Sequence, residues 1–156
     1  MRLHPSQSLD AIEQTPVRTG AVSVGGEVGV NGVFVALGVG ASVAVLVRQA
    51  LEFRPQVVAV ADRTLRAEVA AALPFAQVVD DLADLVEPAD VVVNGVVGFA
   101  GLPVTTRTLQ LGRRLALANK ESLVVGGELV TALAEATGAH LIPVDSEHSA
   151  LFQLIE

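Results

Sequence analysis

Two short segments of this 156-residue sequence concentrate the side chains that can do chemistry. The first, Leu117–Val124 (LANKESLV), places an amide, an ammonium group, a carboxylate and a hydroxyl at four consecutive positions. The second, Pro143–Ala150 (PVDSEHSA), holds two carboxylates, two hydroxyls and an imidazole. Each segment is predicted to be the end of an apolar strand that runs into a helix. Ligands of parallel α/β sheets bind at this position.

The carboxylates of the second segment suit a metal ion. Asp145 and Glu147 are two residues apart, so an extended backbone points both side chains to the same side. Carboxylate oxygens are preferred by hard divalent cations such as Mg²⁺ or Mn²⁺. The same residues also suit a plain helix start, where Asp, Ser and Glu are favoured as caps and by the helix dipole, and spacing alone favours this second interpretation. His148 is predicted to be structural or to support a ligand.

The other polar residues each have two interpretations. Lys120 could hold a phosphate or a sugar oxygen, or it could be a surface lysine paired with Glu121. Asn119 could contact a cofactor through its amide, or it could be a turn residue that tolerates an unusual backbone conformation. Ser122 and Ser146 could bind substrate oxygens or cap helices. The residue types therefore indicate a polar site without deciding its ligand.

Short apolar strands alternate with helices from Val33 onward. The predicted strands are Val33–Leu37, Val57–Ala61, Gln77–Val79, Asp90–Asn94, Arg114–Ala118 and Leu141–Val144. The predicted helices are one capped by Ser42, Leu65–Leu73 capped by Asp62, Asp81–Val86, Val104–Leu111, Glu121–Thr137 and one that starts at Ser149. Uninterrupted apolar strands that alternate with helices indicate a parallel sheet covered on both faces. The predicted fold is therefore a doubly wound, Rossmann-like α/β sheet, whose neighbouring strands should bring the two polar segments together.

One stretch does not fit this alternation. Residues Ala21–Gly32 are rich in Gly and Val, and we expect a hairpin or a disordered insert there. The window Val28–Val47 approaches the length of a membrane-spanning helix, but its glycines favour two short soluble elements.

Composition excludes several classes of function. The net charge is −7 and the ten basic residues are scattered, which argues against nucleic-acid binding. The chain has no cysteine, so neither a disulfide framework nor a thiolate metal site is possible. Residues Met1–Pro16 contain no apolar core of a signal peptide. These features favour a cytoplasmic protein, and 51% apolar residues suffice for a substantial core.

Leu117–Val124 and Ile142–Gln153, separated by a helix of this length, resemble the two signature segments of the 1-deoxy-D-xylulose 5-phosphate reductoisomerase family. The similarity extends over about Val33 to Gln153, and it includes Glu52–Pro55, Val58–Asp62, Ala89–Asn94 and Val97–Leu102. Leu9–Ile12 also resembles the first helix of the family. The resemblance implies a metal-dependent rearrangement and NADPH reduction of 1-deoxy-D-xylulose 5-phosphate to 2-C-methyl-D-erythritol 4-phosphate, a step of non-mevalonate isoprenoid synthesis.

The resemblance also implies roles for individual residues. Asp145 and Glu147 match carboxylates that bind Mg²⁺ or Mn²⁺. The residues that match contacts to the sugar phosphate are Lys120, Ser146 and Glu147, of which Lys120 and Glu147 would be catalytic. The residues that match the NADPH site are Gly40, Ala41, Ser42, Asn119 and Glu121. Ala41 stands where the family usually has a basic or polar residue.

The two ends of the sequence depart from the family. Family members begin with a strand and a Gly-Ser/Thr-rich turn that opens the first helix. Leu9–Ile12 lies too near the start for that strand, so we expect a sheet that lacks the usual first strand, which the segment Ala21–Val30 could partly replace. The sequence also stops before the third metal carboxylate of the family.

This pattern predicts two partial domains. Residues 1–118 would be an incomplete NADPH-binding domain, and residues 119–156 would begin a catalytic, metal-binding domain. We expect the chain alone to be inactive. Its expected partner is a small sugar phosphate substrate, with no nucleic acid and no membrane, and the resemblance implies a homodimer for complete family members. The alternative is a non-catalytic nucleotide-binding or interaction module derived from the same fold.

Overall fold

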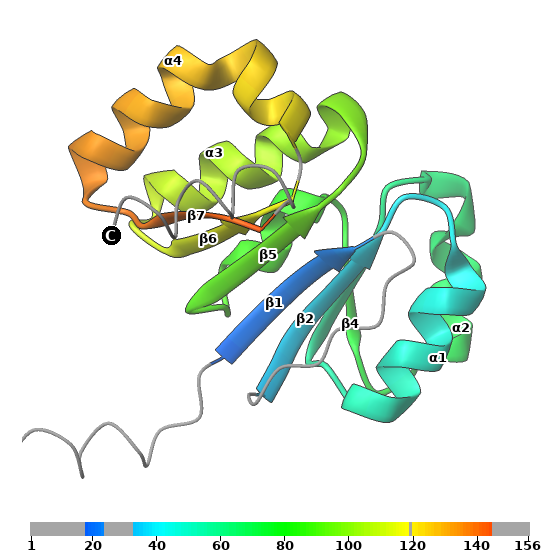
Figure 1. Ribbon diagram of the computed structural model, residues 1–156. Helices are drawn as coiled ribbons and strands as arrows, with labels where there is room; N and C mark the ends of the chain where they lie inside the picture. The colour runs from blue at the N-terminus through cyan, green and yellow to red at the C-terminus, as the bar shows by residue number, and fades with distance from the viewer. Residues whose placement is uncertain (1–17, 24–32, 119, 145–156) are drawn as a thin grey trace, which may run out of the picture.

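Seven parallel strands form the centre of the computed structural model, which describes residues 18–23, 33–118 and 120–144 (Figure 1). The strands are β1 Arg18–Ser23, β2 Val33–Val39, β3 Val57–Val60, β4 Gln77–Val79, β5 Val91–Gly95, β6 Arg114–Leu117 and β7 Leu141–Pro143. Their order across the sheet is β4-β3-β2-β1-β5-β6-β7, and every neighbouring pair is parallel. The order reverses direction at β1, as expected for a doubly wound sheet.

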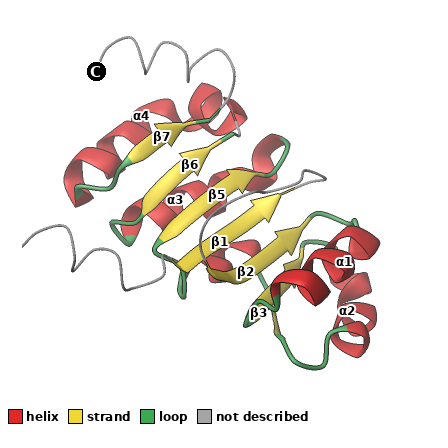
Figure 2. Ribbon diagram, turned by 60° about the horizontal axis from the view of Figure 1, so that its bottom comes forward, coloured by secondary structure: helices red, strands yellow, loops and turns green. Residues whose placement is uncertain are grey.

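From β2 onward, helices and 3₁₀ turns lie between successive strands, and the helices cover the sheet (Figures 1 and 2). The α-helices are α1 Val43–Phe53, α2 Arg66–Ala72, α3 Leu102–Gln110 and α4 Lys120–Thr137. The 3₁₀ turns are η1 Arg63–Leu65, η2 Leu82–Val86 and η3 Gly98–Gly101. In both ribbon views, α1 and α2 lie beside the β2–β4 half of the sheet, and α3 and α4 lie beside the β5–β7 half.

Two apolar cores lie on opposite faces of the sheet. Successive residues of a strand point to opposite faces, and β3 shows this plainly. Val58 and Val60 pack with Leu46 of α1, whereas Ala59 between them packs in the core that contains Leu109 of α3. All five side chains are buried. Because β3 is apolar at every position, both of its faces can be covered, which explains why the sheet is wound on both sides.

Glycines end two of the helices as the sequence predicts. Gly112 follows α3 with a φ of +63°, and Gly138 follows α4 with a φ of +68°. Residues other than glycine rarely adopt this left-handed conformation, so glycine is favoured directly after a helix. Asp62 caps η1 by accepting a hydrogen bond from the Thr64 N–H group.

Most predicted elements are present, with two local differences. Residues 82–86, predicted as part of a helix, form the 3₁₀ turn η2, which is started by a capping box between Asp81 and Asp84. Ser42 occupies the N-cap position of α1, but its side chain makes no capping hydrogen bond. The helix predicted from Ser149 lies outside the described residues.

The expectation that the sheet lacks a first strand is wrong. Residues Arg18–Ser23 form β1, which pairs with β2 on one side and with β5 on the other. The physical reason is that β2 and β5 would otherwise each leave a row of backbone N–H and C=O groups without partners in the middle of the molecule. The prediction of a hairpin or disordered insert is therefore also wrong for Ala21–Ser23, whereas residues 24–32 lie outside the described residues.

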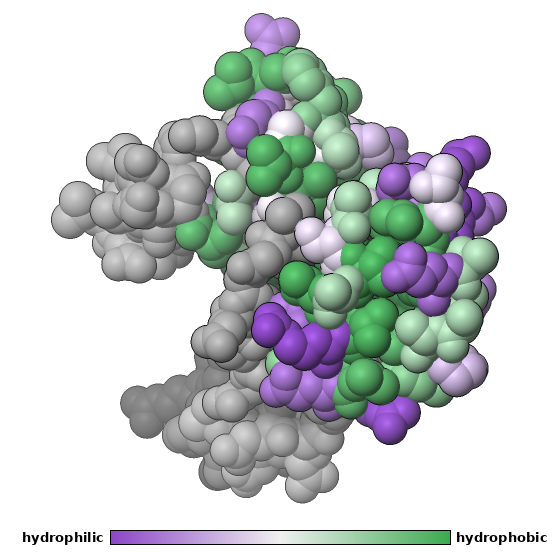
Figure 3. Space-filling model, turned by 90° about the vertical axis from the view of Figure 1, so that its right-hand side faces the viewer, coloured by the Kyte–Doolittle hydropathy of each residue, from purple (hydrophilic) through white to green (hydrophobic). Residues whose placement is uncertain are grey.

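Some large apolar side chains remain exposed. On α4 these are Val124, Val125 and Leu129, and near η3 they are Val97 and Phe99. Figure 3 shows the side of the molecule where α1 and α2 lie, and there apolar and hydrophilic residues are interspersed. Among the described residues, no helix combines the length and apolar character that a membrane crossing requires.

The central place of β1 leads to a stability prediction. Replacing Ala21 with proline removes an N–H group from a strand that is paired on both sides, so Ala21→Pro should lower the free energy of unfolding by at least about 1–3 kcal/mol. Urea denaturation followed by circular dichroism measures the change. Ala21→Ser keeps the N–H group and serves as the control. Equal urea midpoints for the two variants would show that this segment does not pair in the sheet.

Candidate functional site

The predicted site residues follow the carboxyl ends of the strands. β6 ends at Leu117 and β7 ends at Pro143, and these two residues are paired in the sheet. The Val144 N–H group donates a hydrogen bond to the Leu117 carbonyl oxygen at 3.1 Å. The prediction that neighbouring strands bring the two polar segments together is therefore confirmed for the strand ends that lead into them.

Several site residues lie outside the part of the chain that the structure describes. These are Asn119, Asp145, Ser146 and Glu147, together with His148. Lys120 is the first residue of α4, and Glu121 is half-buried in the first turn of that helix. The metal and substrate assignments accordingly remain predictions from the sequence.

The second group of predicted cofactor residues follows β2. Gly40 is half-buried, and no atom lies within 4 Å of the position that a Cβ atom would take there. Ala41 and Ser42 are exposed and lead directly into α1, whose first turn contains no acidic residue. The start of a helix carries partial positive charge and N–H groups without helix partners, so this end of α1 is electrostatically suited to an anion.

The two groups lie at one edge of the sheet but not side by side. Strands β1 and β5 separate β2 from β6. Gly40–Ser42 and the start of α4 therefore border the carboxyl ends of the central strands from opposite sides. An extended ligand could contact both groups by lying across β1 and β5, at the point where the strand order reverses.

A buried hydrogen-bond network supports the start of α4. Asn94, near the end of β5, is fully buried, and its Nδ2 donates to the Gly101 carbonyl oxygen at 2.8 Å and to the Thr105 Oγ1 at 2.9 Å. The Thr105 hydroxyl donates in turn to the Ser122 Oγ at 3.4 Å. Asn94 is not among the site residues predicted from the sequence, where it is marked only by its position as a single amide after three valines.

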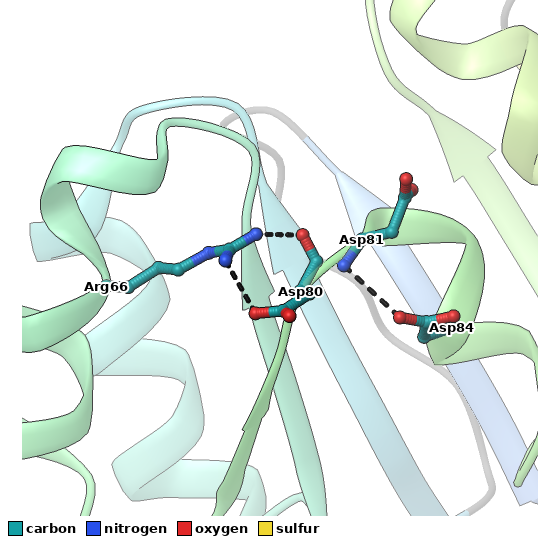
Figure 4. Close-up of polar contacts among 4 residues, drawn as sticks. All are labelled: Arg66, Asp80, Asp81 and Asp84. Atoms are coloured by element: carbon teal, nitrogen blue, oxygen red, sulfur yellow. Dashed lines mark hydrogen bonds and ion pairs between the residues drawn. The ribbon is translucent and has the colours of Figure 1, made fainter.

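The other end of the edge is acidic and has a structural role. Arg66 of α2 forms an ion pair with the Asp80 carboxylate and a second hydrogen bond with the Asp80 backbone oxygen, which ties α2 to the end of β4 (Figure 4). The Asp81 N–H group donates to the Asp84 carboxylate at 3.3 Å at the start of η2. These contacts stabilise the end of the edge strand β4 and the turn that follows it. The carboxylates of Asp80 and Asp84 are thereby engaged in contacts within this region.

Asp62 follows β3 and is exposed. Its Oδ1 accepts hydrogen bonds from the Thr64 hydroxyl at 2.7 Å and from the Thr64 N–H group at 2.9 Å. Because both bonds favour the ionised form, they hold the pKa of the Asp62 carboxyl below its ordinary value. Asp62 is therefore charged at neutral pH and would repel an anionic ligand from this end of the edge.

Within the described ranges, no three His, Cys, Asp or Glu residues lie close enough together to hold a metal ion. A surface depression lined by Asp90, Arg113, Arg114 and His140 lies at the amino-terminal edge of the sheet, where β5, β6 and β7 begin. That depression is remote from the strand ends that carry the predicted site.

Comparison with known proteins decides the family. The family model described as 1-deoxy-D-xylulose 5-phosphate reductoisomerase matches residues 21–127, which is more than half of the chain. This chain belongs to the 1-deoxy-D-xylulose 5-phosphate reductoisomerase family. The family was inferred from the Leu117–Val124 and Ile142–Gln153 segments, and that inference is confirmed.

Relatives that carry this name are similar over most of the chain. The protein of Chloroherpeton thalassium is 40% identical over 126 residues, which cover 76% of this chain and 33% of the relative. That of Gloeobacter violaceus is 45% identical over 123 residues, covering 71% of this chain and 31% of the relative. That of Symbiobacterium thermophilum is 38% identical over 160 residues, covering 95% of this chain and 38% of the relative. The chain thus spans about a third of the length of these relatives.

Solved structures of the family have the same arrangement of elements. The reductoisomerase of Zymomonas mobilis in complex with NADPH superposes with a TM-score of 0.81 at 29% identity, over 89% of this chain and 41% of that chain. A reductoisomerase in complex with magnesium also has a TM-score of 0.81, at 31% identity, over 89% of this chain and 40% of that chain. The α/β, Rossmann-like fold class predicted from the sequence is therefore confirmed.

The Asp62 environment predicts a measurable pKa change. Thr64→Val removes the hydroxyl that donates to the carboxylate, so the Asp62 pKa should rise toward its ordinary value, although the bond from the Thr64 N–H group remains. A folded-state pKa that is depressed contributes stability above the unfolded pKa, and that contribution is lost as the pH falls through the folded value. The variant should therefore lose less stability on acidification.

NMR titration of the Asp62 side-chain carboxyl carbon between pH 2 and pH 7 measures this pKa. Thr64→Ser keeps both donors and is the control. An Asp62 pKa that is the same in the Val and Ser variants would mean that the hydroxyl does not stabilise the carboxylate.

Proposed function

We propose that this chain forms the NADPH-binding side of a reductoisomerase site and contributes part of its metal and substrate ligands. The observation that carries the proposal is the pairing of Leu117 with Pro143, because these residues end the two strands that lead into the signature segments. The reaction would convert 1-deoxy-D-xylulose 5-phosphate to 2-C-methyl-D-erythritol 4-phosphate. The alternative of a non-catalytic module is not favoured, since the chain belongs to an enzyme family.

The residues at the end of β2 fit an anionic dinucleotide. The space beside Gly40 is open, Ala41 and Ser42 are exposed, and the first turn of α1 carries no carboxylate that would repel a phosphate. In the proposal, Gly40–Ser42 hold the adenosine phosphate of NADPH, and Asn119 and Glu121 contact the cofactor at the far side of β1 and β5. NADPH would supply the hydride, and this chain would orient it and exclude water.

The proposed metal and substrate ligands follow β6 and β7. Asp145 and Glu147 would hold Mg²⁺ or Mn²⁺ through carboxylate oxygens, which are the ligands that such cations prefer. The metal would supply polarisation of the substrate oxygens. Lys120, Ser146 and Glu147 would bind the sugar phosphate, with Lys120 placing its charge beside oxygens that become more negative during the rearrangement.

The two sets of ligands suggest the division of the chain. Residues 1–118 would form the NADPH-binding part and residues 119–156 would begin the catalytic part, whose strand β7 extends the same sheet by pairing with β6. Association as a homodimer, a cytoplasmic location and the absence of nucleic-acid and membrane partners remain predictions. Each of these predictions concerns the whole protein, and the fold of the described residues does not bear on it.

Ligand titrations test the proposal directly. The 156-residue chain should bind NADPH saturably, and it should bind Mn²⁺ weakly, because two carboxylates leave most coordination positions to water. It should show no turnover on its own. Asp145→Asn and Glu147→Gln should each weaken Mn²⁺ binding measured by electron paramagnetic resonance, whereas the control Asp62→Asn should not. Mn²⁺ affinity unchanged in both variants would contradict the metal assignment, and turnover by the isolated chain would contradict the predicted inactivity.

Ala41 offers a separate test of the cofactor site. Ala41→Lys introduces a cation beside the start of α1, so it should strengthen binding of the NADPH 2′-phosphate by about 0.5–1 kcal/mol at low salt, and less as salt is added. Fluorescence titration with NADPH measures the affinity, and NADH, which lacks this phosphate, is the matched control. An equal gain for both nucleotides would place the 2′-phosphate elsewhere.

A further inference from the structure

Four polar side chains are buried within the described part of the chain. They are Asn94, Thr105, Thr108 and Ser122. Asn94, Thr105 and Ser122 are joined by hydrogen bonds that run from β5 through α3 to α4. We propose that these hydrogen bonds form a positioning network, which holds the first turn of α4 in the place where Lys120 and Glu121 act. The inference rests on the proposed function, since it concerns the same site.

The hydrogen bonds around Asn94 define its orientation. Its Nδ2 donates to the Gly101 carbonyl oxygen at 2.8 Å and to Thr105 Oγ1 at 2.9 Å, and its Oδ1 accepts from the Val96 N–H group at 3.2 Å. A rotated amide would turn Nδ2 toward an N–H donor and Oδ1 toward a carbonyl oxygen, which would oppose like groups. The amide is thus held in one orientation at the carboxyl end of β5.

This orientation decides which way the Thr105 hydroxyl points. Because the Thr105 oxygen accepts a hydrogen bond from the Asn94 amide, the Thr105 O–H group is available to donate a hydrogen bond to Ser122 Oγ, at 3.4 Å. Both hydroxyls are buried, so water does not compete for these bonds. The network therefore fixes the position of the start of α4 relative to the end of β5.

The backbone of α4 explains why its first turn needs a separate support. Gly126 has φ −113° and ψ 15°, which are not helical values, so a kink separates residues 120–125 from the rest of the helix. A Cβ atom at Gly126 would lie 3.0 Å from the Leu102 side chain, so the helix approaches α3 closely at that point. Packing of the long segment after the kink therefore does not by itself place the short segment before it.

Thr108 provides a control within the same helix. It is as buried as Thr105, but its hydroxyl donates to the Val104 carbonyl oxygen of α3 at 2.6 Å. Replacing either threonine with valine removes one buried hydroxyl and keeps the shape of the side chain. Only the change at Thr105 interrupts the connection to α4.

The experiment compares Thr105→Val with Thr108→Val and with Thr105→Ser, which keeps the hydroxyl. Amide hydrogen exchange is followed at Val124 and Val125, whose N–H groups bond back to the first turn in α-helical geometry. Exchange at these two amides should be about fivefold faster or more in Thr105→Val than in Thr108→Val, since the loss of roughly one hydrogen bond corresponds to about that factor. Thr105→Ser should restore the slow exchange.

NADPH titration of the same proteins gives the second measurement. NADPH should bind about fivefold more weakly to Thr105→Val and equally well to Thr108→Val and to the wild-type chain. Equal exchange rates and equal NADPH affinities in the two valine variants would overturn the positioning role. If wild-type chain fails to bind NADPH, the proposed function fails, and the exchange data still decide whether the network holds α4.

Ser122→Ala replaces Thr105→Val in these measurements if the Thr105→Val protein does not fold. It removes the hydroxyl at the α4 end of the network and leaves the hydrogen bond between Asn94 and Thr105 intact. Faster exchange at Val124 and Val125 in that variant than in Thr108→Val supports the proposal, and unchanged exchange overturns it.

Discussion

The two-sided pairing of β1 is the constraint on which the rest of the structure depends. β2 lies on one side of it, in the half that carries α1 and α2, and β5 lies on the other, in the half that carries α3 and α4. Backbone pairing through Arg18–Ser23 therefore joins the two halves within the sheet, and the core that contains Ala59 and Leu109 joins them on one face. A central strand must pair its N–H and C=O groups on both sides, and this requirement depends little on side chains. A short segment with few strand-forming residues can therefore fill the position.

The parallel direction of all strands gathers the polar residues at one edge. The loops after β2 and β6 leave β1 and β5 between them, and each loop runs into the start of a helix. Helix starts attract anions, whereas Asp62 and Asp80 at the β3–β4 end carry negative charge and are held by Thr64 and Arg66. The charge distribution along the edge therefore favours an anionic ligand near the centre of the sheet and disfavours it at the β4 end.

Sequence reasoning succeeded where the signal is local. The strands at Val57–Val60 and Val91–Gly95 were both predicted, because they lie on the apolar runs 57–61 and 91–93, each of which is bounded by polar residues. It failed at Arg18–Ser23, because a strand with Gly20 at its centre and little alternation has no local signal, and only its two neighbours require it. For the site, the signature segments predicted which strands end together, but the side chains of Asp145–Glu147 lie outside the described residues.

The sequence by itself determined the family, the α/β alternation and the chemical character of the candidate ligands, since these depend on residue types at short spacing. Only the tertiary structure decided that β1 completes the sheet and that Asn94, Thr105 and Ser122 meet in a buried network. These three residues are 11 and 17 positions apart along the chain, and each is a common residue with an ordinary role in its own element. Their connection arises from the packing of β5, α3 and α4 against one another, and contacts over such separations leave no periodic pattern in a single sequence.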